Sequence, residues 1–482
     1  MILYLEAKIM VIKKLVIKQL HGVYNYTVKF NDDLTFIYGE NGCGKTTILN
    51  IVSSIVTGKI YNLSSYNFEK IILYYSHKKT RKQERIEIIS LNNSYVIYLS
   101  EIDLKETIEN IERISEMLSR EDDEHSFERR FMHMYESSGF IKTNFNYIYL
   151  PLSRNSQNGI DAKDFRAFPR RRQPYYSEKD ITNKNYLNDS LHYVEEIVKD
   201  GYMRINYSEL SINNRFRSNI FTSSLKVTSE YSSSVLSEAF KRKNNSIPNI
   251  DKNKDEYIKL LKSIGEWNED TEKSVEKFFK KYREAFQKSK KDTGVTIEFL
   301  LMNMELERIK EIASQAQIVE REKEDVRLPI TNFLEIVNKF FAVSADKKKI
   351  SISNDGKIVV EADSPRRKLS LYNLSSGEKQ IVIIFACLIF GLPINQNGIY
   401  IIDEPEASLH LAWQKIFVDA IQKVNNSIQF IFATHSPEII GRYSSHAEKL
   451  NKTISKIKSK TGDELYEWLC WWFVLFIRRI IK

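Results

Sequence analysis

The sequence predicts an α/β fold in which both ends of the chain contribute to one parallel sheet, with a large and mainly helical insertion between them. Three observations predict it. A glycine-rich loop near residue 40 joins an expected strand, 34–38, to an apolar helix. Two further apolar segments, 399–402 and 428–433, are each followed by polar residues. Continuous apolar runs of this length are typical of strands that are buried on both faces of a sheet.

The glycine-rich loop is the first element of this fold that carries chemistry. Residues 39–46 read Gly-Glu-Asn-Gly-Cys-Gly-Lys-Thr and fit the phosphate-loop pattern G-x-x-x-x-G-K-[ST]. Glycines let the backbone turn its N–H groups inward, and the helix that follows directs its positive end at a bound anion. Lys45 is expected at the β- and γ-phosphates of ATP, and the Thr46 hydroxyl on Mg²⁺. The other residues expected at the nucleotide are Gly39, Asn41, Gly42, Cys43, Gly44 and Thr47. A glycine-rich turn that binds nothing is the alternative.

Two carboxylates follow the second expected strand. Asp403 stands at its carboxyl end, where open α/β sheets place ligands, and is expected to hold Mg²⁺ directly or through water. Glu404 points to the opposite side and is expected to polarise the attacking water. Phosphoryl transfer needs mainly positioning and charge neutralisation, so these two carboxylates suffice. The alternative is an acidic strand end that caps the next helix.

Polar residues also stand before a long apolar helix, 380–388, and after the third expected strand. Ser375, Ser376 and Gly377 are good N-terminal capping residues, so this helix start can also face an anion. His435 follows the strand 428–433 and is expected at the same sheet edge as Asp403. Caps and structural histidines are common, so the interpretation of both features rests on the order of the motifs.

In that order the motifs resemble those of the ABC-class ATPases. Residues 374–378, Leu-Ser-Ser-Gly-Glu, resemble the signature that precedes the Walker B strand, and His435 resembles the switch histidine. The resemblance implies that the chain binds ATP and Mg²⁺ and hydrolyses ATP, with Glu404 and His435 acting in hydrolysis. It also implies that Ser376 and Gly377 contact ATP held by a second subunit, which makes a homodimer or a higher homo-oligomer. The sequence identifies no counterpart of the glutamine loop of this class.

Two segments favour one branch of the class. Asp-Glu-Pro-Glu-Ala-Ser-Leu at 403–409 and Gln-Phe-Ile-Phe-Ala-Thr-His-Ser-Pro at 429–437 look like the ATPases related to RecF, SMC and OLD proteins. Over residues 11–60 and 365–442 the chain looks most like ATPase subunits of bacterial anti-phage systems, such as the PtuA ATPases of Septu and some retrons, and next like the AriA ATPases of PARIS. That resemblance implies control of a separate effector protein, an HNH- or TOPRIM-type nuclease.

Two other functions stay open at this point. One is a DNA-repair or recombination ATPase of the RecF or SMC kind. The other is the nucleotide-binding subunit of a transporter, against which the large insertion between phosphate loop and signature argues.

The chain is expected to have four parts: an N-terminal half of the ATPase head, 1–100; a mainly helical insertion with long basic loops, 101–345; a C-terminal half of the head, 346–445; and a basic and aromatic tail, 446–482. Within the insertion, apolar residues recur at helical spacing over 102–117, 257–291 and 297–342, the last interrupted at Pro329. Residues 151–190 and 205–255 are predicted to be loops because they are rich in Asn, Ser and Arg.

The net charge of +9 includes three basic clusters: Arg166 with 170–172, the lysines and arginine of 277–291, and 366–368. Such clusters attract nucleic-acid phosphates, but a solvated basic surface is an equal alternative. Three cysteines, at 43, 387 and 470, share no metal-ligand spacing and argue for no disulfide, so a reducing cytoplasm is the expected location. The aromatic segment 465–477 is shorter than the ~20 residues that span a bilayer. An interfacial anchor is one alternative. A partner-docking helix or a late frameshift is the preferred interpretation of this tail.

Overall fold

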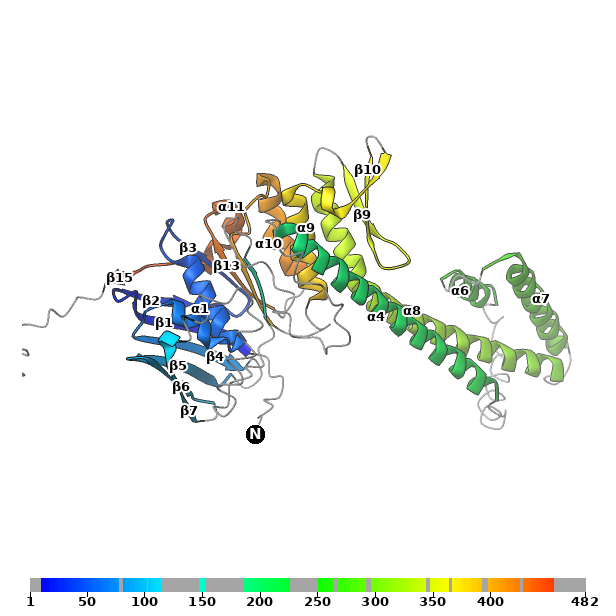
Figure 1. Cartoon of the computed structure of the whole chain (residues 1–482). Coiled ribbons are helices and arrows are strands. Elements are labelled where there is room, and N and C mark those ends of the chain that lie inside the picture. Colours follow the sequence, from blue (N-terminus) through cyan, green and yellow to red (C-terminus); the bar gives the residue numbers. More distant parts are fainter. Residues whose placement is uncertain are drawn as a thin grey trace, which may run out of the picture. The chain divides into compact units, whose positions relative to one another are not determined.

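The computed structural model describes residues 10–77, 81–101, 103–113, 116, 147–151, 186–225, 250–263, 267–291, 296–343, 347–363, 366–391, 398–424 and 428–454. The chain divides into two compact units. Unit 1 contains Met1–Ile197, Ile336–Ser351 and Ile358–Lys482, and unit 2 contains Val198–Glu335 and Ile352–Lys357. Figure 1 shows the helices and strands of both.

A parallel sheet of five strands forms the centre of unit 1. Its order is β14-β3-β13-β12-β8, and every neighbouring pair is parallel. The strands are β3 (Leu34–Tyr38), β8 (Tyr147–Pro151), β12 (Ile399–Asp403), β13 (Gln429–Thr434) and β14 (Ala447–Lys449). One sheet therefore contains strands from both chain ends, which confirms the predicted α/β fold.

Unit 1 also contains an antiparallel sheet of seven strands, in the order β15-β2-β1-β4-β5-β6-β7. Helix α1 (Lys45–Thr57) shares one apolar core with both sheets, because Ile48 and Ile55 of the helix pack with Leu15 of β1 and with Ile401 of β12. The antiparallel strands are β1 (Met10–Leu20), β2 (Tyr24–Lys29), β4 (Lys70–His77), β5 (Gln83–Leu91), β6 (Ser94–Leu99), β7 (Leu104–Glu109) and β15 (Thr453–Ile454).

The other face of the parallel sheet is covered by helices α9 (Ser376–Phe390) and α10 (Leu411–Val424) and by the end of α8 (Ile297–Ala342). Their contact with the sheet is aromatic. Phe417 lies 6.3 Å from both Phe385 and Phe432, measured between ring centroids, and Phe340 lies 5.5 Å from Phe385. The central strands β3, β12 and β13 are almost wholly buried, as expected of strands that are covered on both faces of a sheet.

One buried side chain joins the two sheets. The amide of Gln429 on β13 donates to the carbonyl oxygens of Ile12 and Asn31, and its oxygen accepts from the Ile12 N–H.

The smaller elements of unit 1 are η1 (Ile60–Ser65), β10 (Ile358–Asp363), β11 (Arg366–Leu369), η2 (Leu371–Asn373), α11 (Pro437–Ile440) and η3 (Gly441–His446). Strand β9 (Lys348–Ile352) pairs with β10.

Unit 2 is helical. It holds α4 (Tyr186–Leu225) from Val198 onward, α6 (Ile250–Ser263), α7 (Glu269–Lys291) and α8 up to Glu335. Helices α7 and α8 bury Phe279, Tyr282 and Phe299, and the Tyr282 hydroxyl donates to Asn303 at 3.0 Å. Two ion pairs, Arg215–Glu322 and Arg327–Glu209, connect α4 to α8 within this unit.

Three sequence-based expectations about the insertion were wrong. The helical pattern of 102–117 contains strand β7, which pairs antiparallel with β6 and belongs to the N-terminal sheet, so the head does not end at residue 100. Strand β8 also lies inside the expected insertion, yet it belongs to the parallel sheet. Part of the loop expected at 205–255 is helical, namely the end of α4 and the start of α6.

Helix α8 runs through Pro329, where an interruption was expected. A proline inside a helix costs about 3 kcal/mol. The four aromatic and apolar side chains that follow Pro329 and are fully buried offset this cost: Phe333, Val337, Phe340 and Phe341.

Candidate nucleotide-binding site

The sheet brings three of the sequence motifs to one edge. In the parallel register Tyr38 of β3 pairs with Thr434 of β13, and Asp403 of β12 pairs with Ala433. The phosphate loop, the two carboxylates and His435 therefore leave neighbouring strands at their carboxyl ends.

The phosphate loop turns between β3 and α1 with glycines in the left-handed region. Gly42 has φ +75° and Gly44 has φ +101°. A Cβ on Gly44 would also lie 3.0 Å from the Tyr26 hydroxyl, which donates to the Cys43 carbonyl at 3.1 Å. Tyr26 of strand β2 thus supports the phosphate loop, and only glycine fits at position 44 without displacing Tyr26.

The first turn of α1 carries no anion of its own. Gly44 provides no side-chain cap, and no acidic residue lies in that turn. The positive end of the helix is therefore left for a ligand. Of the residues expected at the nucleotide, Asn41, Gly42 and Thr46 are exposed, Gly39, Gly44 and Thr47 are half-buried, and Cys43 and Lys45 are buried.

Lys45 is held inside the loop. Its side chain is buried, with only 5% of its surface exposed. The ammonium group donates to the carbonyl oxygens of Gly39 and Glu40 at 3.1 and 3.2 Å and lies 3.4 Å from Nδ1 of His435. Backbone dipoles thus hold the cation at the place where phosphate charge is expected.

Asp403 is buried without compensation. It is 1% exposed, and neither carboxylate oxygen has a hydrogen-bond partner among the described residues. Burial is the main reason why the pKa of Asp403 is raised from 3.8 to about 6. The Thr46 hydroxyl and the Lys45 cation lower this pKa, whereas the negative charges of Glu404 and Glu406 raise it. The Thr46 hydroxyl affects this pKa although it lies outside hydrogen-bonding geometry.

An unpartnered buried carboxylate beside a hydroxyl is a donor set that suits a hard cation such as Mg²⁺. The described residues form no group of three or more His, Cys, Asp or Glu side chains that could hold a metal. Mg²⁺ does not require such a group, because it takes one or two protein ligands and completes its shell with water and phosphate oxygens.

Glu404 leaves the strand in a strained turn. It has φ +52°, its N–H donates to the Ala433 carbonyl at 2.9 Å, and its side chain is half-buried. A non-glycine residue in the left-handed region is uncommon, and such strain gathers at functional sites.

One residue of the site was missed from the sequence. The carboxylate of Glu406 accepts from the Thr434 hydroxyl at 2.8 Å, from the His435 N–H at 2.5 Å and from the Ser436 N–H at 3.1 Å. The only sequence signal was a second glutamate in Asp-Glu-Pro-Glu, and its partners are mostly backbone groups that a sequence does not reveal.

The start of α9 differs from the start of α1. Ser375 caps α9, and Glu378 closes a capping box by accepting from the Ser375 N–H at 2.8 Å. Lys348 of β9 lies 3.0 Å from both oxygens of Glu378, which is buried. This helix start therefore holds its own carboxylate and its own counter-ion.

The two expected signature residues lie in different surroundings. Ser376 is exposed, whereas Gly377 is buried. A Cβ on Gly377 would lie 2.5 Å from the carbonyl oxygen of Ser408, so close packing against the segment after Glu406 already requires glycine here. This packing within one chain was not expected from the sequence.

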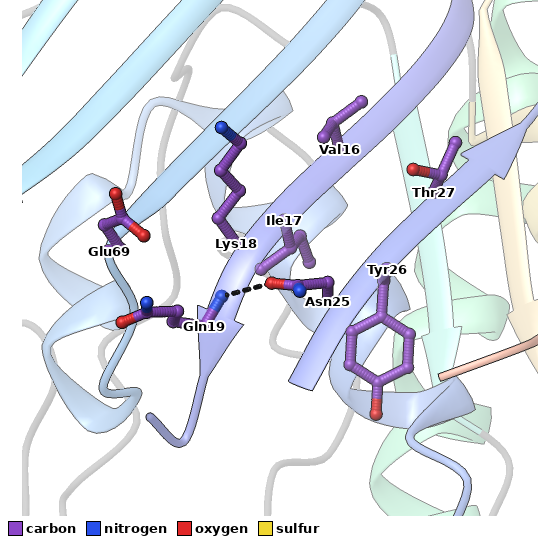
Figure 2. A pocket seen from close by; sticks show the side chains of 8 residues that line it. All are labelled: Val16, Ile17, Lys18, Gln19, Asn25, Tyr26, Thr27 and Glu69. Carbon is purple, nitrogen blue, oxygen red and sulfur yellow. Dashed lines mark hydrogen bonds between the residues drawn. The ribbon is translucent and has the colours of Figure 1, made fainter. Parts of the chain in front are cut away.

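A cavity of about 330 Å³ lies beside strands β1 and β2, with Tyr26 at its border towards the phosphate loop. Figure 2 shows Lys18 and Glu69 on its rim. Both are exposed and opposite in charge, so the cavity has no preference for an anion. Its lining residues are Val16, Ile17, Lys18, Gln19, Asn25, Tyr26, Thr27 and Glu69.

Several expected features lie outside the described residues: Arg166, the arginines 170–172, Cys470 and the tail from 455 onward. Cys43 and Cys387 are free and buried, and burial raises the pKa of the Cys387 thiol. On α7, Lys277, Lys280 and Lys281 are exposed. Among the described helices, none is both long and apolar enough to cross a bilayer.

The site combines a phosphate loop, the uncapped start of α1 and the buried, unpartnered carboxylate of Asp403 at the end of β12. Together these features define a P-loop ATPase. The chain belongs to the AAA ATPase domain family, which it matches over residues 10–440. It is accordingly an ATPase that uses a nucleotide.

Two curated relatives carry names that refer to retrons. The "Retron Ec83 probable ATPase" of Escherichia coli is 33% identical over 109 residues, which are 21% of this chain and 20% of that protein. The "Retron Vc95 probable ATPase" of Vibrio cholerae is 31% identical over 121 residues, 23% of each. The matched segment thus spans about a fifth of the length of these relatives.

Solved structures similar to the chain include Smc head domains. The head of Pyrococcus furiosus Smc with an extended coiled coil has a TM-score of 0.36 at 13% identity, covering 95% of this chain and 100% of that one. The head from Pyrococcus yayanosii has a TM-score of 0.35 at 14% identity, covering 95% and 99%.

Proposed function

We propose that this ATPase is a subunit of a bacterial anti-phage defence system, that it dimerises through ATP, and that it controls a separate effector, a nuclease of the HNH or TOPRIM type. The observation that carries the nucleotide chemistry is the buried, unpartnered Asp403 beside a phosphate loop whose helix start is open. The defence assignment rests on the two relatives named as retron ATPases.

In this proposal the residues act as follows. The loop N–H groups and Lys45 bind the phosphates, and Lys45 neutralises their charge. Asp403 and the Thr46 hydroxyl hold Mg²⁺, which when bound neutralises charge on the phosphate oxygens. Glu404 orients the attacking water, and His435, beside Lys45, faces the γ-phosphate.

Dimerisation is proposed through the start of α9. Ser376 is exposed at the first turn of a helix, so it can reach a nucleotide that a second copy holds.

Because the nuclease is proposed to be a separate effector, the isolated chain is expected to cut neither DNA nor RNA.

The test is to purify the chain together with the products of neighbouring genes and to assay nuclease activity with and without EDTA. The expected result is a stable complex with a second protein that cuts nucleic acid in a metal-dependent way. Cleavage by this chain alone, lost when its own residues are mutated, would contradict the regulatory role.

A second candidate, a RecF- or SMC-like DNA-repair ATPase, is favoured by one observation in unit 2. Lys277, Lys280 and Lys281 are exposed on α7, and no ion pair with a carboxylate is seen for them among the described residues. Unpaired cations on one helix suit phosphate contacts that do not depend on base sequence.

This surface is tested by anisotropy of a labelled duplex with K277Q/K280Q/K281Q. If the surface binds nucleic acid, the triple variant binds roughly 10-fold more weakly at moderate salt, with a shallower salt dependence. The matched control removes three exposed lysines elsewhere, K105Q/K347Q/K423Q. Equal losses in both variants would indicate a general effect of net charge.

A further inference from the structure

We infer that Glu406 is a positioning residue for ATP hydrolysis, which holds the turn that presents His435 and connects it to the turn that presents Glu404. This inference rests on the proposed roles of His435 and Glu404, and it assigns a task to the second glutamate of Asp-Glu-Pro-Glu.

The first step is how the turn after β13 is held. Strand β13 ends at Thr434, and the next two N–H groups have left the sheet. Both donate to one oxygen of Glu406, from His435 at 2.5 Å and from Ser436 at 3.1 Å. The other oxygen accepts from the Thr434 hydroxyl at 2.8 Å, and that hydroxyl accepts from the Ser436 N–H at 3.0 Å.

The second step is why a carboxylate is needed. All three groups that reach Glu406 are donors, and an ionised carboxylate is a pure acceptor with two oxygens. Thr434 is fully buried and Glu406 half-buried, so water competes weakly for these hydrogen bonds. The backbone of His435 is thereby fixed while its side chain stays exposed, 3.4 Å from the Lys45 ammonium group.

The third step is the connection to Glu404. The Glu404 N–H donates to the Ala433 carbonyl, and the Ala407 N–H donates to the Glu404 carbonyl. Glu406 lies inside this turn and reaches back across the end of β13. The backbone of 404–407 and that of 433–436 are therefore joined in both directions and move together.

A further hydrogen bond joins the turn after β13 to α10. The Ser436 hydroxyl donates to Gln414 at 2.7 Å and accepts from the first N–H groups of α11. The turn that carries His435 is thus fixed on two sides, by the Glu406 carboxylate and by Gln414.

The consequence is a fixed separation between the group that faces the γ-phosphate and the group that orients water. Rates of phosphoryl transfer fall steeply when such groups are misplaced, by up to about 100-fold for an error near 1 Å. Nucleotide affinity depends mainly on the loop and Lys45, which Glu406 does not touch among its described hydrogen bonds.

The experiment compares Glu406→Ala, Glu406→Gln and Thr434→Val with the control Glu438→Ala, a nearby carboxylate on α11 that lies 4.0 Å from Lys415. Glu406→Ala is expected to lower kcat by roughly 10- to 100-fold with less than about 3-fold change in ATP affinity. Glu406→Gln keeps one acceptor oxygen but replaces the other with a donor, so its kcat is expected to lie between those of Glu406→Ala and the unmodified chain. Thr434→Val removes one hydrogen bond and should stay within about 5-fold, and the control should be unchanged.

A double-mutant cycle separates positioning from general stability. If Glu406 acts through His435, adding Glu406→Ala to His435→Ala lowers kcat by less than about 3-fold beyond His435→Ala alone. A merely structural glutamate would multiply the two losses, and that result overturns the inference, as does a normal kcat in Glu406→Ala.

Two further outcomes are kept apart. Normal hydrolysis in His435→Ala would refute the proposed role of His435, and the inference with it. Slow hydrolysis in His435→Ala with multiplicative losses refutes the inference only. Should Glu406→Ala fail to fold, the cycle is run with Glu406→Met, which keeps the length of the side chain and removes both acceptor oxygens, and it is read by the same criterion.

Discussion

Two helix starts in unit 1 were both expected to face a nucleotide, and they are built in opposite ways. Helix α1 begins without a side-chain cap and without an acidic residue in its first turn. Helix α9 begins with a complete capping box, in which Glu378 occupies the position of an anion and Lys348 compensates its charge.

This difference indicates that the two helix starts have different functions. An open helix start with a buried cation binds phosphate within one chain. A closed start has little remaining affinity for an anion, so what α9 presents is the exposed Ser376. We therefore expect α1 to determine affinity and α9 to determine whether a composite site closes.

The largest effect is expected at the open start. Lys45→Ala removes the one side-chain cation that lies inside the loop, so ATP affinity should fall by on the order of 100-fold or more. Equilibrium binding of a fluorescent ATP analogue measures this, with Lys415→Ala on the surface of α10 as control. Unchanged affinity would place the phosphates elsewhere.

The next effect isolates chemistry from both helix starts. Glu404→Gln keeps the shape of the side chain and loses the charge that orients water, so turnover should fall by about 100-fold or more while ATP still binds. An ATP-bound dimer should accumulate, and light scattering after gel filtration would detect it. Near-normal turnover would assign the water to another group.

The comparison itself is tested at the closed start. Ser376→Arg should leave ATP affinity within about 3-fold but lower turnover by at least 10-fold, because bulk at an interface prevents closure. Mixing it with Lys45→Ala should restore at most one working site per dimer. If Ser376→Arg hydrolyses ATP normally, α9 does not act across subunits.

The smallest effect concerns stability and pH. Asp403 has a pKa of about 6 in the folded chain against a reference value of 3.8, so protonation favours the folded state. Its contribution to stability is present below pH 4 and is lost as pH rises through 6. Asp403→Asn should therefore raise the unfolding free energy by roughly 1–3 kcal/mol at pH 7.5 without Mg²⁺, and hardly at pH 4. Chemical denaturation at the two pH values measures it; equal gains at both would show that charge is not the cause.

The parts of the fold that follow local rules were predictable. The strand before the phosphate loop, the apolar strand ending at Asp403 and the start of α9 each have a short pattern with one physical meaning. Strand β7 at the edge of the antiparallel sheet was missed because it combines apolar and charged residues in a spacing that also suits a helix. Its pairing with β6 decides the outcome, and pairing is not visible in a local window.

Other features depend on distant partners. The end of α4 is rich in Asn, Ser and Arg, and it is helical beside α8, to which Arg215 and Glu209 connect it by ion pairs. Glu406 was missed for the same reason, since its partners lie on another strand. The composition of a segment cannot indicate such partners.

The presence of early and late strands in one sheet has a consequence during synthesis. Both neighbours of β3 in the parallel sheet, β13 and β14, come from the last part of the described chain. Lys45 and His435 are 390 residues apart. At roughly 5–20 residues per second, a ribosome needs about 20–80 s between them. Throughout that time both hydrogen-bonding edges of the apolar strand β3 lack their final partners.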